Sequence, residues 1–85
     1  MAAEQSMWHV NDVVAYDVMS AISGSLQARL LDRIQRGDES ARTELRDVRL
    51  ATTRLDGYDR AKVDAYTQQL QLRDVELAGL DSRAR

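Results

Sequence analysis

The stretch AYDVMSAISGSLQARLL, residues 15–31, decides the fold because it places a Ser-Gly-Ser tripeptide inside an otherwise helical pattern. A break at Gly24 would produce a four-helix domain in which the apolar stripes on both sides of the glycine turn inward. Glycine supports a break, since it costs about 1 kcal/mol relative to alanine in a helix interior. Without a break, a single long helix would run through the tripeptide.

Apolar residues on both sides of Gly24 favour the single long helix. They recur at every fourth position and are Val10, Val14, Val18, Ile22, Leu26, Leu30 and Ile34. A chain reversal would also need a Gly-Asp or proline pair, and residues 23–25 contain neither. We therefore predict a continuous helix over residues 8–36, with the kinked or broken helix as the alternative.

The segment RGDES, residues 36–40, predicts the end of this helix and the start of the next. Gly37 suits the left-handed position that follows a helix C-terminus. Asp38 or Ser40 can then cap the second helix, which we place at residues 39–56. Its predicted buried stripe has spacings of three and four and consists of Ala41, Leu45, Val48, Thr52 and Leu55.

The segment LDGYDR, residues 55–60, predicts a second helix boundary. Gly57 ends one helix and Asp59 opens another over residues 59–78, with Tyr58 expected to pack on Val63 as a hydrophobic staple. The buried face of this third helix is expected to contain Val63, Tyr66, Leu70 and Leu77, with Asp74 interrupting it.

Length and composition indicate one all-α domain over residues 1–85, a three-helix bundle with a long N-terminal helix. Proline is absent and strong helix formers are abundant. Residues 1–7 and 79–85 are expected to fray. A chain of 85 residues buries only about 60–65% of its unfolded surface, and the absence of cysteine excludes disulfides. A protein partner is therefore an expected source of additional stability.

The charged residues argue against several functional classes. The chain has 12 basic and 14 acidic residues, and arginines alternate with acids, so no basic patch for nucleic acid is expected. A DNA-binding regulator would need clustered cations, and Lys62 is the single lysine. The interleaved acids are interpreted as members of surface ion pairs: Asp12, Asp17, Glu44, Asp47, Asp56 and Asp64.

Catalysis, cofactor binding and membrane insertion are not indicated either. The single histidine, His9, has no recognisable nucleophile and orienting acid beside it, and the chain has no plausible zinc ligand set. No glycine-rich phosphate loop is present, so we expect no enzyme activity, metal or cofactor. No apolar run is long enough to span a bilayer and no signal peptide is recognisable, so a cytoplasmic location is expected.

A mismatch in helix length suggests a surface for a partner. A helix of 28 residues is about 42 Å long, whereas one of 17 residues reaches about 25 Å, so the first helix should extend beyond the second. Its N-terminal turns concentrate apolar and amphipathic residues, with two acids between them. The predicted partner-binding residues are Trp8, Val10, Asp12, Val14, Tyr16, Asp17 and Val18.

This layout resembles that of the epsilon-type antitoxins, small all-helical proteins that inhibit zeta-type toxins, which are P-loop kinases. The resemblance covers residues 10–75 and rests on helix order, helix lengths and a few apolar positions. The segments that carry it are SAISGSLQARLLDRIQRGDES in the first helix, ARTELRDVRLATTRLDGY in the second and DRAKVDAYTQQLQL in the third.

The resemblance implies that the partner is a P-loop kinase-like toxin. The N-terminal helix would lie over the nucleotide-binding region of the toxin and keep ATP or the phosphate acceptor from binding productively. Asp12 and Asp17 would pair with a basic phosphate site, and toxin–antitoxin pairs could assemble further. The alternative is a helical structural or adaptor module, a homodimer in which two copies of Val10, Val14 and Val18 meet across a two-fold axis.

Overall fold

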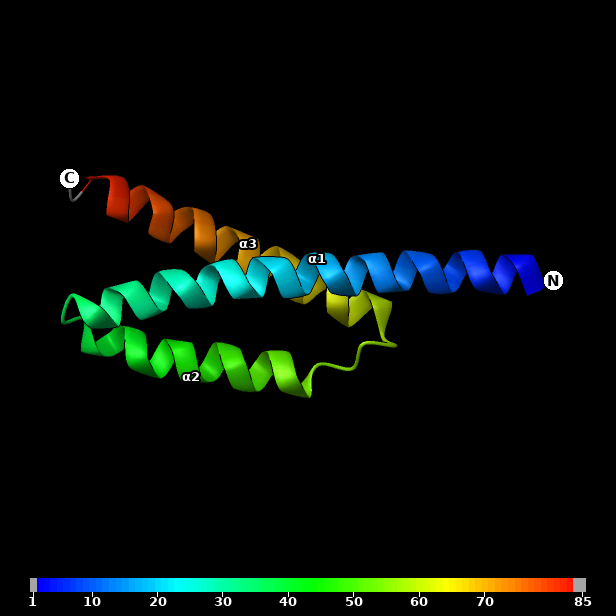
Figure 1. Cartoon of the computed structure of the whole chain (residues 1–85), viewed down its shortest axis with the longest axis horizontal. Coiled ribbons are helices and arrows are strands. Elements are labelled where there is room, and N and C mark those ends of the chain that lie inside the picture. Colours follow the sequence, from blue (N-terminus) through cyan, green and yellow to red (C-terminus); the bar gives the residue numbers. More distant parts are fainter. Residues whose placement is uncertain (1, 84–85) are drawn as a thin grey trace.

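The computed structural model describes the backbone of residues 2–83 and the side chains of residues 11–83, which form a bundle of three helices (Figure 1). The helices are α1 (Ala2–Gln35), α2 (Glu39–Arg54) and α3 (Arg60–Arg83). The predicted all-α three-helix fold is confirmed. None of these helices combines the length and the apolar character that a membrane span requires.

Helix α1 runs through the Ser-Gly-Ser tripeptide without a break, so the four-helix alternative is wrong. The two serines attach α1 to different helices. The Ser23 hydroxyl lies 2.9 Å from the Thr52 hydroxyl of α2, and the Ser25 hydroxyl donates to the Asp74 carboxylate of α3 at 3.1 Å. Gly24 between them is exposed, and a Cβ there would have no neighbour within 4 Å. The tripeptide is therefore a point of attachment and not a hinge.

The outer helix ends lie beyond their predicted positions. Helix α1 begins at Ala2, before the predicted start at residue 8, and α3 continues to Arg83, past the predicted end at residue 78. Residue 1 and residues 84–85 lie outside the described part of the chain. The expected fraying of residues 1–7 and 79–85 concerns motion and stays a prediction.

The junction between α1 and α2 follows the predicted glycine and aspartate signals. Gly37 has a φ of 99°, which is the left-handed region. Its N–H donates to the Ile34 carbonyl at 2.9 Å and the Asp38 N–H donates to the Arg33 carbonyl at 3.0 Å, the pair of bonds of a Schellman motif. The Asp38 carboxylate then accepts from the Ser40 N–H at 3.1 Å and caps α2.

The junction between α2 and α3 confirms one expectation and corrects another. The Asp59 carboxylate accepts from the Lys62 N–H at 3.2 Å, so Asp59 caps α3. The predicted staple of Tyr58 on Val63 is wrong, because Tyr58 is 84% exposed. The Asp56 carboxylate accepts from the Tyr58 N–H at 2.9 Å in a tight turn that leaves the ring in solvent.

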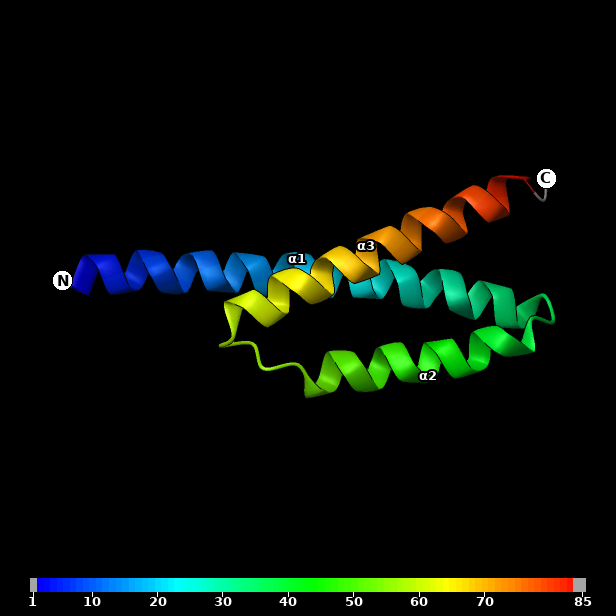
Figure 2. The same cartoon turned by 180° about the vertical axis from the view of Figure 1, so that it is seen from behind.

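Helix α1 is the centre of the fold. Helices α2 and α3 pack on α1 and diverge from each other, as the two opposite views show (Figures 1 and 2). The molecule measures 54 × 23 × 16 Å, and the 34 residues of α1, at about 1.5 Å each, account for its long axis. The buried apolar side chains are Met19, Leu26, Leu30, Ala41, Leu45, Val63, Leu70 and Leu77.

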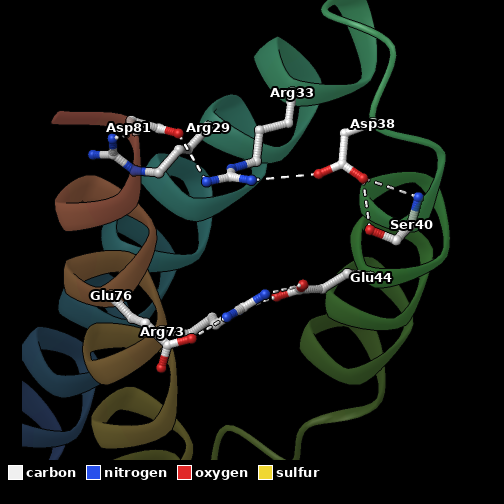
Figure 3. Close-up of polar contacts among 8 residues, drawn as sticks. All are labelled: Arg29, Arg33, Asp38, Ser40, Glu44, Arg73, Glu76 and Asp81. Atoms are coloured by element: carbon white, nitrogen blue, oxygen red, sulfur yellow. Dashed lines mark hydrogen bonds and ion pairs between the residues drawn. The ribbon is translucent and has the colours of Figure 1, made fainter. Parts of the chain in front are cut away.

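Direct contacts between α2 and α3 are few and polar. Arg73 donates from two nitrogens to the two carboxylate oxygens of Glu44, each at 2.7 Å, and also pairs with Glu76 (Figure 3). The Tyr66 hydroxyl donates to the Val48 carbonyl at 3.2 Å. The hydrogen bond from Arg73 is the main cause that lowers the pKa of Glu44. These contacts connect two helices whose backbones diverge.

Ion pairs also attach the C-terminal half of α3 to α1. Arg29 pairs with Asp74 at 3.0 Å and with Asp81 at 3.4 Å, and Arg33 pairs with Asp81 at 2.9 Å. Arg33 also reaches the cap residue Asp38 at 3.3 Å (Figure 3). Asp74, the acid that interrupts the apolar face of α3, therefore forms an ion pair between that face and α1.

Candidate protein-binding surface

The N-terminal part of α1 extends beyond the rest of the molecule, as predicted, but the extension is shorter than expected. Its first turns project past α2, α3 and the loop between them (Figures 1 and 2). Arg60, the first residue of α3, pairs with Asp12 at 3.3 Å. Residues 2–11 therefore form the extension, whereas residues 12–18 lie beside the loop and the first turn of α3. The cause is that the first residue of α3 lies closer to the N-terminus of α1 than the last residue of α2 does.

Three valines of α1 form an exposed ridge at the base of this extension. Val13, Val14 and Val18 are 57%, 54% and 47% exposed, and we call them the valine ridge. Asp17 is exposed too. It lies beside Val13 and Val14 on the helix surface, because residues three and four positions apart along a helix are neighbours. Large contiguous apolar patches are typical of interaction surfaces, so the valine ridge is the candidate surface of this molecule.

A depression on one side of the valine ridge contains two tyrosines, and we call it the tyrosine depression. It has a volume of about 370 Å³ and is lined by Asp12, Val13, Tyr16, Leu55, Gly57 and Tyr58. The Tyr16 ring lies so close to Gly57 that a Cβ at that position would be 3.2 Å from two ring carbons. The loop between α2 and α3 thus fixes one tyrosine and presents the other to solvent.

A second depression lies on the α3 side of the valine ridge. It has a volume of about 380 Å³ and is lined by Asn11, Val14, Ala15, Val18, Arg60, Asp64 and Thr67. Arg60 lies in its wall and pairs with Asp64 of α3 at 3.0 Å and with Asp12 of α1 at 3.3 Å. The hydrogen bond to Asp64, followed by the one to Asp12, raises the pKa of Arg60, which stays cationic.

The predicted partner-binding residues divide into three groups. Val14 and Val18 are exposed on the valine ridge, with Asp17 among them. Asp12 and Tyr16 contribute to the tyrosine depression, and Asp12 is also held by Arg60. The side chains of Trp8 and Val10 lie outside the described residues. Within residues 11–83, Asp17 makes no ion pair, so it differs from Asp12 in being free of an intramolecular cation.

Sequence reasoning missed three residues of this surface. Val13 was not among the predicted binding residues, and Leu55 and Tyr58 were assigned to packing. Tyr58 carried a usable signal, since an aromatic residue directly after a glycine turn lies in a loop where few side chains can cover it. Leu55 carried no such signal, because it continues the buried stripe of α2.

A third hollow lies between the diverging helices α2 and α3. It has a volume of about 220 Å³, is mostly apolar and has Leu26 of α1 among its lining residues. Arg73 and Glu44 line it as well and are already paired with each other. This groove follows from the divergence of α2 and α3, and it is smaller than either depression beside the valine ridge. Within residues 11–83, no three side chains of the metal-binding types gather into a metal site.

Comparisons with known proteins do not identify this chain. No family model, no curated protein and no solved structure matches it.

Proposed function

We propose that this chain is an antitoxin-like inhibitor, which binds a kinase-type toxin through the N-terminal third of α1 and blocks its nucleotide or substrate site. The observation that carries the proposal is the valine ridge, three neighbouring valines that are about half exposed although the core of the bundle is small. The exposed half of their surface contributes nothing to folding, whereas burying it in a complex is favourable by about 25 cal/mol per Å² of apolar surface.

The surroundings of the valine ridge support binding to a protein and not to a small molecule. The ridge is convex and runs along a helix, and a depression lies on each side of it. A helix that presents residues at spacings of three and four is suited to a groove on another protein, where its apolar side chains become anchors. The extension of residues 2–11 continues the same helix and would lengthen the contact.

Inhibition would follow if the partner groove is the nucleotide or phosphate-acceptor site of a kinase. Asp17 can then pair with a cation that otherwise holds a phosphate, because carboxylates and phosphates are recognised by the same arginine and lysine groups. Asp12 is less suited to this role, since Arg60 already holds one of its oxygens at 3.3 Å. In this proposal the chain acts by occupying a site and performs no chemistry.

The experiment first asks whether a P-loop kinase of the zeta type is encoded beside this gene, and then co-expresses that kinase with this chain. We expect the unmodified chain to restore growth and to prevent ATP binding by the kinase. The double variant Val14→Asp and Val18→Asp should lose both effects, and deletion of residues 2–11 should weaken them. The control is the double variant Leu72→Asp and Val75→Asp, because both residues are 65% exposed on α3.

Two outcomes would contradict the proposal. One is that no kinase of this type is encoded beside the gene, or that it is not inhibited. The other is that the control variant and the valine variant inhibit equally well. A homodimer through the same valines is the competing account, and sedimentation of the purified chain distinguishes it: a tight dimer that dissociates in the valine double variant would favour self-assembly.

A further inference from the structure

The tyrosine depression has a chemical character that the valine ridge lacks. Its walls contain the aromatic residues Tyr16 and Tyr58 and one charged residue, Asp12, and no lining residue is basic. The volume of about 370 Å³ falls in the range of pockets that bind small groups. A depression with aromatic walls and an acid is suited to a positively charged group, because the faces of aromatic rings attract cations.

The loop between α2 and α3 packs against the Tyr16 ring and holds the backbone of Tyr58 in a turn. Gly57 lies against the Tyr16 ring, and the Asp56 carboxylate accepts from the Tyr58 N–H at 2.9 Å. Tyr58 is nevertheless 84% exposed. A large aromatic side chain on a fixed turn, with almost no intramolecular contact, is typical of binding surfaces, where tyrosine is enriched.

The acids around the depression add to this preference. Asp12 lines it, and one Asp12 oxygen accepts from Arg60 while the other has no hydrogen-bond partner among residues 11–83. Asp17 follows Tyr16 in sequence and is exposed. Because Arg60 already pairs with Asp12, the negative charge that this part of the surface offers to a partner comes mainly from the exposed Asp17, and the complementary charge is positive.

We propose that the tyrosine depression binds an arginine or lysine side chain of the partner protein. This inference rests on the proposed function, since it names the group that the partner places beside the valine ridge. The groove between α2 and α3 of a second copy is a poor source of that cation, because it carries the acids Glu44 and Asp47 and its one base, Arg73, is already paired.

The test uses the free full-length chain and three small probes, so it does not depend on identifying the partner. Amide resonances are followed by NMR during titration with Nα-acetyl-arginine amide, with its uncharged isostere Nα-acetyl-citrulline amide and with Nα-acetyl-leucine amide. We expect the arginine probe to shift Gly57 and Tyr58 about threefold more than the citrulline probe. The effect should be confined to residues that line the depression and should weaken in high salt.

Variants at the exposed tyrosine sharpen the test. Tyr58→Leu should abolish the selective response to arginine, whereas Tyr58→Phe should retain it because the aromatic ring remains. Leu72→Ala, at an exposed apolar residue of α3, is the control and should respond like the unmodified chain. All three variants should keep the dispersed spectrum of the folded bundle, because neither side chain is buried.

The inference is overturned if the citrulline or leucine probe shifts the same resonances as strongly as the arginine probe, or if Tyr58→Leu responds normally. Either result would leave the proposed function standing, since that function is tested by inhibition of the kinase. Conversely, if the double variant Val14→Asp and Val18→Asp still inhibits the kinase, the proposed function is overturned. The response of the tyrosine depression to the arginine probe would be unaffected by that result.

Discussion

The Ser23 hydroxyl lies 2.9 Å from the Thr52 hydroxyl, and this contact is the centre of a polar layer that crosses all three helices. Thr52 lies 3.1 Å from the Tyr66 hydroxyl, which donates to the Val48 carbonyl. Gln27 donates to Ser23 at 3.0 Å. Each hydroxyl can therefore accept from one neighbour and donate to the next. A satisfied layer of this kind fixes the register of the helices, because a slip of one residue would leave its buried groups unpaired.

We predict that Ser23→Ala lowers the free energy of unfolding by about 1 kcal/mol, the typical contribution of one hydrogen bond. Ser23 is only 1% exposed, so water cannot replace the lost hydroxyl. Ser25→Ala is the matched control, because its bond to Asp74 is exposed, and it should cost about half as much or less. Urea denaturation followed by circular dichroism measures both. Equal losses of unfolding free energy in Ser23→Ala and Ser25→Ala would contradict the stabilising role of the polar layer.

Gly24→Ala should stabilise the chain by about 1 kcal/mol, because alanine favours a helix interior and a Cβ there meets nothing within 4 Å. Gly37→Ala should destabilise it by about 1 kcal/mol, because the φ of 99° strains any residue with a side chain. Thermal melts of the two variants compare the glycines directly. A loss of stability in Gly24→Ala would mean that the tripeptide acts as a flexible joint.

Stability should fall in acid partly through Glu44. Its hydrogen bond from Arg73 holds the folded-state pKa below the ordinary value of 4.5. A depressed carboxyl pKa adds stability above the unfolded-state value, and that stability is lost as the pH falls through the folded-state pKa. Glu44→Gln should therefore cost about 1 kcal/mol at neutral pH and almost nothing at a pH well below the folded-state pKa.

The control for this pH dependence is Glu39→Gln. Glu39 is exposed and, among the described residues, pairs only with Arg42, three residues along the same helix, so its replacement should change the pH profile less than that of Glu44 does. Urea melts across the acid range measure both variants. If the unfolding free energy of Glu44→Gln changes with pH in parallel with that of the unmodified chain, the contact between Glu44 of α2 and Arg73 of α3 does not contribute to the loss of stability in acid.

Deletion of residues 2–11 should leave the bundle folded, with a melting temperature close to that of the full chain. The reason is that, among residues 11–83, the first buried apolar residue of α1 is Met19, and the first described contact between α1 and α3 is made by Asp12. Circular dichroism and a thermal melt test this. A cooperative transition that disappears on deletion would show that the extension belongs to the folding core.

Local signals in the sequence predicted the helix boundaries well. Gly37 acts through its left-handed backbone, and Asp38 and Asp59 act as caps, and these effects depend on residues only a few positions away. The predicted role of Gly57 is wrong, because α2 ends at Arg54 with Leu55 as its C-cap and Gly57 does not adopt a left-handed φ. The continuity of α1 through Gly24 was predicted for a similar reason, since neither a proline nor a Gly-Asp pair supports a reversal there. These features require no knowledge of the neighbouring helices.

The face that α1 buries was harder to predict. A row of residues at every fourth position turns by about 40° per step around the helix, so the row from Val10 to Ile34 cannot mark a single face. The buried face alternates steps of three and four and includes Met19, which the prediction omitted. The partners of Asp12 and Ser23 lie on other helices 48 and 29 residues away, and no local pattern specifies them.

The central claim is that the valine ridge and the tyrosine depression form one surface that a partner protein covers. Hydrogen exchange, measured by mass spectrometry on the free chain and on its complex with the proposed kinase partner, tests this most directly. We predict that binding slows exchange in residues 12–18 and 55–60 and leaves residues 72–83 of α3 unchanged. Slower exchange confined to α2 and the C-terminal half of α3, with residues 12–18 unaffected, would contradict the account.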